Sequence, residues 1–181
     1  MKKEFTFDHI HALHNSMKSA AADVSAAEAA LVAAAAEVDA AKQDDGSIAP
    51  EAILERIASA EKTQRLRTIE ANRAGAKLAE AEASFHQEVL ESAPNLIAFL
   101  DERASIQKKD LEGRILAIDG LDKNSVGLVS QLAGSSPAVR AIFGASASIQ
   151  RSLSMNEIYA ESEGGASPAL VASVLAASEF V

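Results

Sequence analysis

The sequence predicts an all-α protein built on a long antiparallel helical hairpin, and three observations lead to this prediction. Aliphatic residues recur every seven positions through the first quarter of the chain. A second long apolar pattern of helical period follows after a very short turn. Aromatic residues make up only 4% of the chain and Trp is absent. A core made largely of Ala side chains must be thin and extended, because each Ala removes little surface from water when buried.

The first helix is expected to begin near Asp8, a suitable N-cap, and to end near Lys42. Thirteen of the 22 residues from 20 to 41 are Ala, the best helix former. A heptad seam runs along it, and small residues at every second seam position allow a partner helix to approach to about 8 Å. The seam consists of Ile10, Met17, Val24, Leu31 and Val38, alternating with Leu13, Ala20, Ala27, Ala34 and Ala41.

The second helix is expected from about Pro50 to Glu91, after a turn formed by residues 43–47. A turn this short makes the two helices antiparallel neighbours. Charge favours their pairing. Residues 15–45 hold two basic and six acidic side chains, whereas residues 56–79 hold six basic and two acidic ones.

A third helix is predicted after a break at Ser92–Asn95, because the residue before Pro94 avoids the α conformation. This helix should end at the turn formed by residues 119–124. Residues 1–124 would then form one elongated helical domain, and residues 125–181 a small Ser/Gly/Ala-rich docking region.

Short helices are expected in residues 125–181. Ser136-Pro137 and Ser167-Pro168 resemble an N-cap followed by a first-turn proline, and Ser154 with Glu157 has the spacing of a capping box. Alternation over residues 146–154 leaves a small strand as an alternative.

The first helix also has an unusual face opposite its seam. A solvated face would normally carry Lys and Glu, but this one is almost entirely Ala, and we hypothesise that another helix or subunit covers it. The alternative is that Ala merely favours the helix on an exposed face. The face consists of Ala12, Ser19, Ala26, Ala33 and Ala40 in one row and Ala22, Ala29 and Ala36 in the next.

Composition and charge limit the cellular compartments and the classes of partner that we expect for this chain. The formal net charge of −9 disfavours nucleic-acid binding, and the absence of Cys excludes disulfides and thiolate metal sites. Acidic and histidine residues follow Met1-Lys2-Lys3 where a signal peptide would need an apolar run. The uncharged apolar runs are far shorter than the ~18 residues of a membrane span. We therefore expect a cytoplasmic or virion protein with no membrane partner.

Few residues carry recognisable chemistry. His9, His11 and His14 resemble a metal cluster, but His9 lies about 200° around the helix from His11, so the three rings do not converge. Polar residues at a helix start are the favoured interpretation, and a ring of histidines around an oligomer axis is an alternative.

Two other patterns are also better explained structurally. Lys62, Arg65, Arg73 and Lys77, with Arg67 nearby, could contact phosphates, but a basic stripe without interleaved aromatics favours pairing with an acidic helix or partner. Asp119, Asp122 and Asn124 lack the alternation and terminal Glu of a calcium loop, which favours a helix-ending turn.

The sequence therefore predicts a non-enzymatic structural or assembly protein, without cofactor or metal. It would act as a homo-oligomer or as a subunit of a larger complex such as a virion or phage particle. The alternative is an acidic helical adaptor, chaperone or inhibitor of one protein partner. A metal-dependent enzyme using His11 and His14 is a third, weaker hypothesis. The predicted interface residues are Ile10, Met17, Val24, Ala26, Ala29, Leu31, Ala33, Ala36 and Val38.

Overall fold

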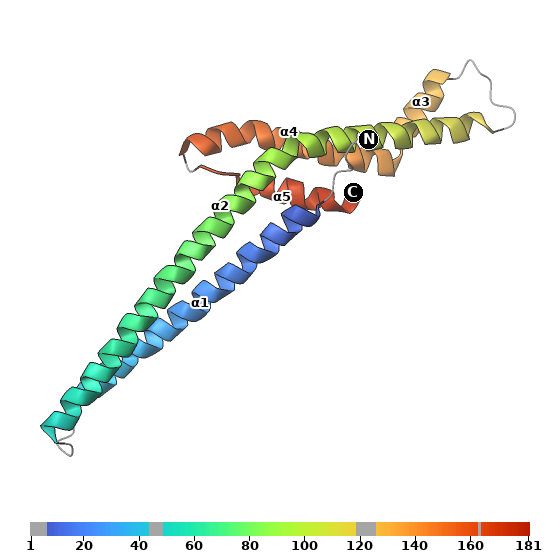
Figure 1. Cartoon of the computed structure of the whole chain (residues 1–181). Helices are drawn as coiled ribbons and strands as arrows, with labels where there is room; N and C mark the ends of the chain where they lie inside the picture. The colour runs from blue at the N-terminus through green and yellow to red at the C-terminus, as the bar shows by residue number, and fades with distance from the viewer. Residues whose placement is uncertain (1–6, 44–48, 119–125, 163) are drawn as a thin grey trace. The chain divides into compact units, whose positions relative to one another are not determined.

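The computed structural model describes residues 7–43, 49–118, 126–162 and 164–181, and within them the chain is 93% helical with no strand (Figure 1). The predicted all-α hairpin fold is confirmed, because the two long helices α1 and α2 pack closely against each other. The helices are α1 (Asp8–Lys42), α2 (Pro50–Leu116), α3 (Val126–Gly134), α4 (Pro137–Ser162) and α5 (Pro168–Ala176), followed by the 3₁₀ helix η2 (Ala177–Phe180).

The chain divides into two compact units. The hairpin unit comprises His11–Phe85, and the bundle unit comprises the residues up to Ile10 together with His86–Val181. The predicted domain boundary between residues 124 and 125 lies outside the described residues.

The hairpin unit is held by a seam between α1 and the first half of α2, which lie side by side in Figure 1. Helix α1 begins and ends where the sequence predicts, with Asp8 in its first turn and Lys42 in its last. Its seam residues between Leu13 and Ala41 are all buried or half-buried, whereas its alanine face is exposed. On α2 residues of restricted exposure recur at three-and-four spacing, with one gap of seven between Gln64 and Ala71: Ile53, Ile57, Ala60, Gln64, Ala71, Ala74, Leu78, Ala81 and Phe85.

The predicted break at Ser92–Asn95 is wrong, because α2 continues through Pro94 to Leu116. Proline removes one backbone donor, which leaves the carbonyl of Leu90 without its usual partner. Pro94 lies on the exposed side of the helix, where water can reach the freed carbonyl. Its neighbours Ala93 and Leu96 are fully buried. Tertiary packing of these side chains outweighs the local preference against the α conformation, and the predicted second and third helices are one.

The bundle unit buries one apolar stripe from each of its helices. On α2 and α4 the buried positions repeat at helical spacing, and α3 and α5 contribute shorter stripes. The serine Ser146 on α4 also lies in this contact, where its hydroxyl donates to Asp101 Oδ1 of α2 at 2.6 Å. The core residues of these helices are Val89, Ala93, Leu96, Leu100 and Ala104 of α2, Val129 and Ala133 of α3, Val139, Ile142 and Ile149 of α4, and Leu170 and Val174 of α5, and Phe7, Ile10, Ala166 and Ala177 are buried with them in this unit.

Helix α4 corrects two predictions about residues 146–154. The alternative strand is wrong, because the whole stretch is helical and buries Ser146 and Ile149 on one face. The predicted capping box at Ser154 is also wrong. Ser154 lies inside α4, where its hydroxyl donates to the carbonyl of Gln150. An apolar pattern of helical period over the longer segment overrides the local signals.

The turn between α4 and α5 is fixed by a buried asparagine. Asn156 Oδ1 accepts from the Ser167 amide at 2.6 Å, and Nδ2 donates to the Gly165 carbonyl at 3.4 Å. Gly165 has φ +73°, and a Cβ there would lie 2.8 Å from His86 Nδ1, so this position requires glycine. The predicted start of α5 is confirmed, with Ser167 as N-cap accepting from the Leu170 amide ahead of Pro168.

We predict that Pro94→Ala stabilises the protein by about 2 kcal/mol, because it restores an intrahelical hydrogen bond without filling a buried site. Urea denaturation followed by circular dichroism measures this change. The adjacent exposed substitution Asn95→Ala is the control and should change stability by less than about 0.7 kcal/mol. A lower stability of Pro94→Ala would show that the proline ring itself supports the packing.

We expect Asn156→Ala to cost about 1–3 kcal/mol, because it leaves the buried Ser167 amide without an acceptor. Thermal unfolding of this variant and of Gln150→Ala, an exposed position on the same helix, measures the difference. Equal melting temperatures for the two variants would contradict the role assigned to the asparagine.

Candidate interaction surface

The five large seam residues predicted as interface pack within the chain. Met17, Val24 and Leu31 are half-buried and Val38 is buried in the hairpin unit, whereas Ile10 is buried in the bundle unit. Their side chains are already used for intramolecular packing, and any contact of α1 with another molecule therefore falls to its outer face.

The four alanines predicted as interface are exposed together on that outer face. This exposed face extends beyond Ala26, Ala29, Ala33 and Ala36 to Ala22 at one end and Ala40 at the other, which are also exposed. Their spacing of four, three, four, three and four residues is that of a second heptad seam, nearly opposite the first. We call these six alanines, with the neighbouring Val32, the α1 outer face. Val32 retains 71% of its exposure.

The outer side of α2 in the hairpin unit holds large apolar residues that the sequence reasoning did not identify as exposed. Leu66 and Ile69 retain 53% and 47% of their exposure. The half-buried positions of α2 skip from Gln64 to Ala71, and Leu66 and Ile69 lie on the opposite side of the helix. The apolar residues of this segment form two offset stripes, and the sequence pattern does not show which of them meets α1.

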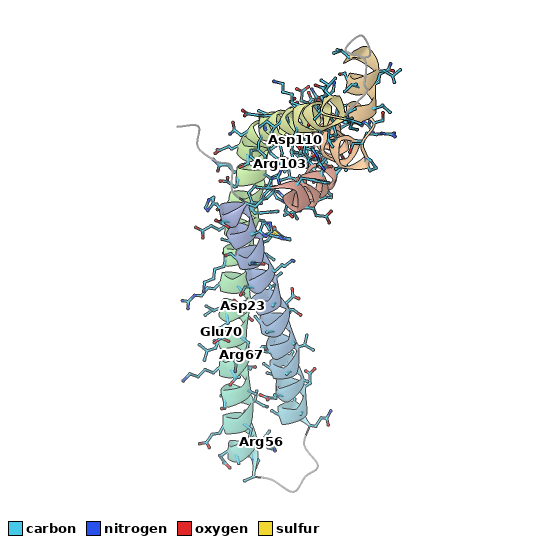
Figure 2. All side chains as sticks on the ribbon, turned by 90° about the vertical axis from the view of Figure 1, so that its right-hand side faces the viewer. Asp23, Arg56, Arg67, Glu70, Arg103 and Asp110 are labelled. Atoms are coloured by element: carbon cyan, nitrogen blue, oxygen red, sulfur yellow. The ribbon has the colours of Figure 1, made fainter. Side chains whose placement is uncertain are left out.

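The basic stripe of α2 lies in solvent. Lys62, Arg65, Arg73 and Lys77 are all exposed. Arg67 pairs with Glu70 at 2.7 Å along the same helix. Figure 2 labels this pair on α2 and Asp23 on α1.

Charged side chains of both helices line two shallow hollows along the hairpin seam. Asp23 of α1 and Lys77 of α2 line both hollows, and Glu70 and Arg73 line one of them. The acidic side chains of the lining come from both helices, since Glu70 and Glu80 of α2 line the hollows as well as Asp23 of α1. The lining contains serine hydroxyls but no His or Cys.

The three N-terminal histidines are placed in different environments. His14 is half-buried and its ring stacks on Phe85 at 5.1 Å between centroids. His9 and His11 are exposed. Among the described residues no group of three His, Asp or Glu side chains could hold a metal ion. The structure therefore does not bring all three histidines to one point, although His11 lies close enough to His14 for its charge to lower the His14 pKa. The other pattern considered for a metal, Asp119 with Asp122 and Asn124, lies outside the described residues.

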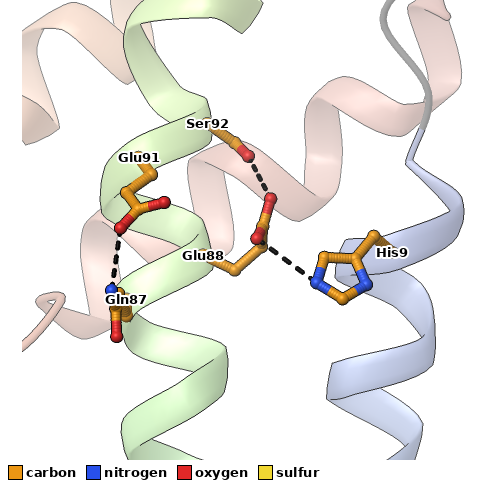
Figure 3. A network of polar contacts seen from close by, with 5 residues as sticks. All are labelled: His9, Gln87, Glu88, Glu91 and Ser92. Carbon is orange, nitrogen blue, oxygen red and sulfur yellow. Dashed lines mark hydrogen bonds and ion pairs between the residues drawn. The ribbon is translucent and has the colours of Figure 1, made fainter.

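His9 takes part in a small polar network in the bundle unit (Figure 3). Its Nε2 lies 3.4 Å from Glu88 Oε2, and the other oxygen of Glu88 accepts from the Ser92 hydroxyl at 2.7 Å. Gln87 donates to Glu91 on the neighbouring side of α2 at 2.8 Å. Glu88 thereby ties the start of α1 to α2 within this unit.

No family model, curated protein or solved structure matches this chain. Among the described residues α1 alone is long and apolar enough to cross a membrane by length and composition, with a mean hydropathy of 1.3 in its most apolar window. Only 6% of that window is buried within the structure.

The hairpin unit should lose stability in mild acid through His14. Burial, followed by the charges of Lys18 and His11, lowers the pKa of His14 below its usual 6.5. The unfolded chain therefore binds a proton more readily than the folded one, and folding is favoured at pH values above about 6.5. This contribution to stability is lost as the pH falls from there through the lowered pKa.

Urea denaturation of the wild type and of His14→Gln between pH 5 and pH 8 tests this prediction. The unfolding free energy of the wild type, relative to that of His14→Gln, should increase from pH 5 to pH 8. A pH-independent difference would contradict the assignment of this effect to His14.

Proposed function

We propose that this chain is a non-enzymatic structural protein that packs through the α1 outer face into a larger assembly, such as a virion or phage particle. The observation that carries the proposal is the exposed second heptad seam of alanines. A solvated helix face would normally carry charged side chains, whereas a face of small residues lets another helix approach closely along several turns.

The alanines alone provide a modest driving force. At about 0.8 kcal/mol for each buried methyl group, six of them yield about 5 kcal/mol. Association costs an estimated 4–15 kcal/mol in lost translational and rotational freedom. A stable contact therefore needs further apolar or charged groups beside the alanines, or many copies of the contact in one particle.

A second candidate is an adaptor that binds one protein partner, and it is favoured by the outer side of α3. This helix contains no charged residue, and Val126, Leu128 and Leu132 retain between 55% and 63% of their exposure. An uncovered apolar side on a short helix suits docking into a groove of a partner.

Native mass spectrometry of the full chain isolated from its source distinguishes the two candidates. A structural component should occur in a multi-copy particle of fixed stoichiometry, and the double variant Ala26→Arg with Ala33→Arg should lose that particle while keeping its helicity. Ala160→Arg, at an exposed position of α4, is the matched control and should assemble normally.

An adaptor should instead occur in a one-to-one or two-to-two complex that is lost on Leu128→Glu and retained in the arginine variant. Recovery of the chain in the membrane fraction after an alkaline wash would contradict both candidates.

A further inference from the structure

We propose that the α1 outer face binds the outer side of α2 from a second copy of this chain, so that hairpins associate head to tail. This inference rests on the proposed function and names the partner of the α1 outer face. It follows from two exposed apolar patches within the hairpin unit that complement each other in shape and charge.

The patch on α1 is shallow and bordered by acids. Val32 stands beside the exposed alanines, with Glu28 one turn before it and Asp39 two turns after it on the same side. All of these residues are exposed. Small side chains at Ala29 and Ala33 leave room for larger ones from a facing helix.

The patch on α2 is raised and bordered by cations. Leu66 and Ile69 project from the exposed side, with Lys62 one turn before Leu66 and Arg73 one turn after Ile69. Arg65 adds a further positive charge one turn before Ile69. We call these five residues the α2 ridge.

Charge selects the pairing of one patch with the other. Two α1 outer faces would bring Glu28 and Asp39 of each copy together, and two α2 ridges would bring their cations together, so both like pairings are repelled. The pairing of α1 with α2 places large side chains against small ones and opposite charges beside each other. This pairing also supplies the large apolar and charged side chains that the alanines lack.

The arrangement of the two patches makes the contact head to tail. Leu66 and Ile69 lie opposite the seam of α2, and Ala29 and Ala33 lie opposite the seam of α1, so the apolar centres of the two patches point away from each other on the hairpin. At the border of the α2 ridge, Arg73 also lines the hollow beside Asp23. A contact between unlike patches leaves one patch free on each end of a dimer, and further copies add until a ring closes or an open array grows.

Sedimentation velocity of the purified full chain tests the inference. The wild type should form species larger than a dimer as its concentration rises, and the apparent association constant should fall at least tenfold between low salt and about 0.5 M salt, because exposed charges are screened.

Two blocked variants then test the pairing itself. The first carries Ala29→Glu and Val32→Glu on α1, and the second carries Leu66→Glu and Ile69→Glu on α2. Each should stay monomeric alone, and their equimolar mixture should form a one-to-one dimer and nothing larger. A control with Ile106→Glu and Ile158→Glu, both exposed in the bundle unit, should associate as the wild type does. Circular dichroism verifies that all variants fold.

Three results would overturn the inference. These are a wild type that stays monomeric at all concentrations, a second variant that still dimerises through α1 alone, and a mixture that does not form the dimer. If the particle from the source holds a different protein on the α1 outer face, the proposed function stands and this inference fails. If neither self-association nor a multi-copy particle is found, both fail.

Discussion

The hairpin unit depends on close packing between α1 and the first half of α2. Ala occupies one of the two seam positions of α1 from Ala20 to Ala41, and Ala60, Ala71, Ala74 and Ala81 occupy facing positions on α2. Small side chains bring the helix backbones close together, and dispersion along several turns then replaces the deep burial of large side chains. Few of these residues are fully buried. Such a seam stabilises the hairpin through many small contacts along its length. The opposite sides of both helices take no part in these contacts.

The bundle unit is stabilised differently. Its helices bury Leu, Ile and Val side chains completely, and its polar contacts hold particular segments in place. Asn156 fixes the turn before α5, Ser146 joins α4 to α2 through Asp101, and Glu88 links His9 to α2. Each of these contacts joins different parts of the unit, so together they specify how its elements pack.

The interaction surface that emerges is a property of helix sides rather than of a pocket. Apolar residues lie outside on α1, on α2 and on α3. Acidic residues border the patch on α1, and basic residues border the patch on α2. A chain with this pattern is suited to contacts along whole helices.

The sequence by itself determined the bounds of α1, the seam positions along it, the antiparallel hairpin and the start of α5 at Ser167. These depend on heptad spacing, on turn residues and on capping, which act between residues close in the chain. The alanines of the α1 outer face could also be identified from the sequence alone. Tertiary structure decided that α2 runs through Pro94, because buried Ala93 and Leu96 outweigh the missing hydrogen bond. It also decided that Leu66 and Ile69 face outward, because a helix with two apolar stripes can bury only the one that meets its partner.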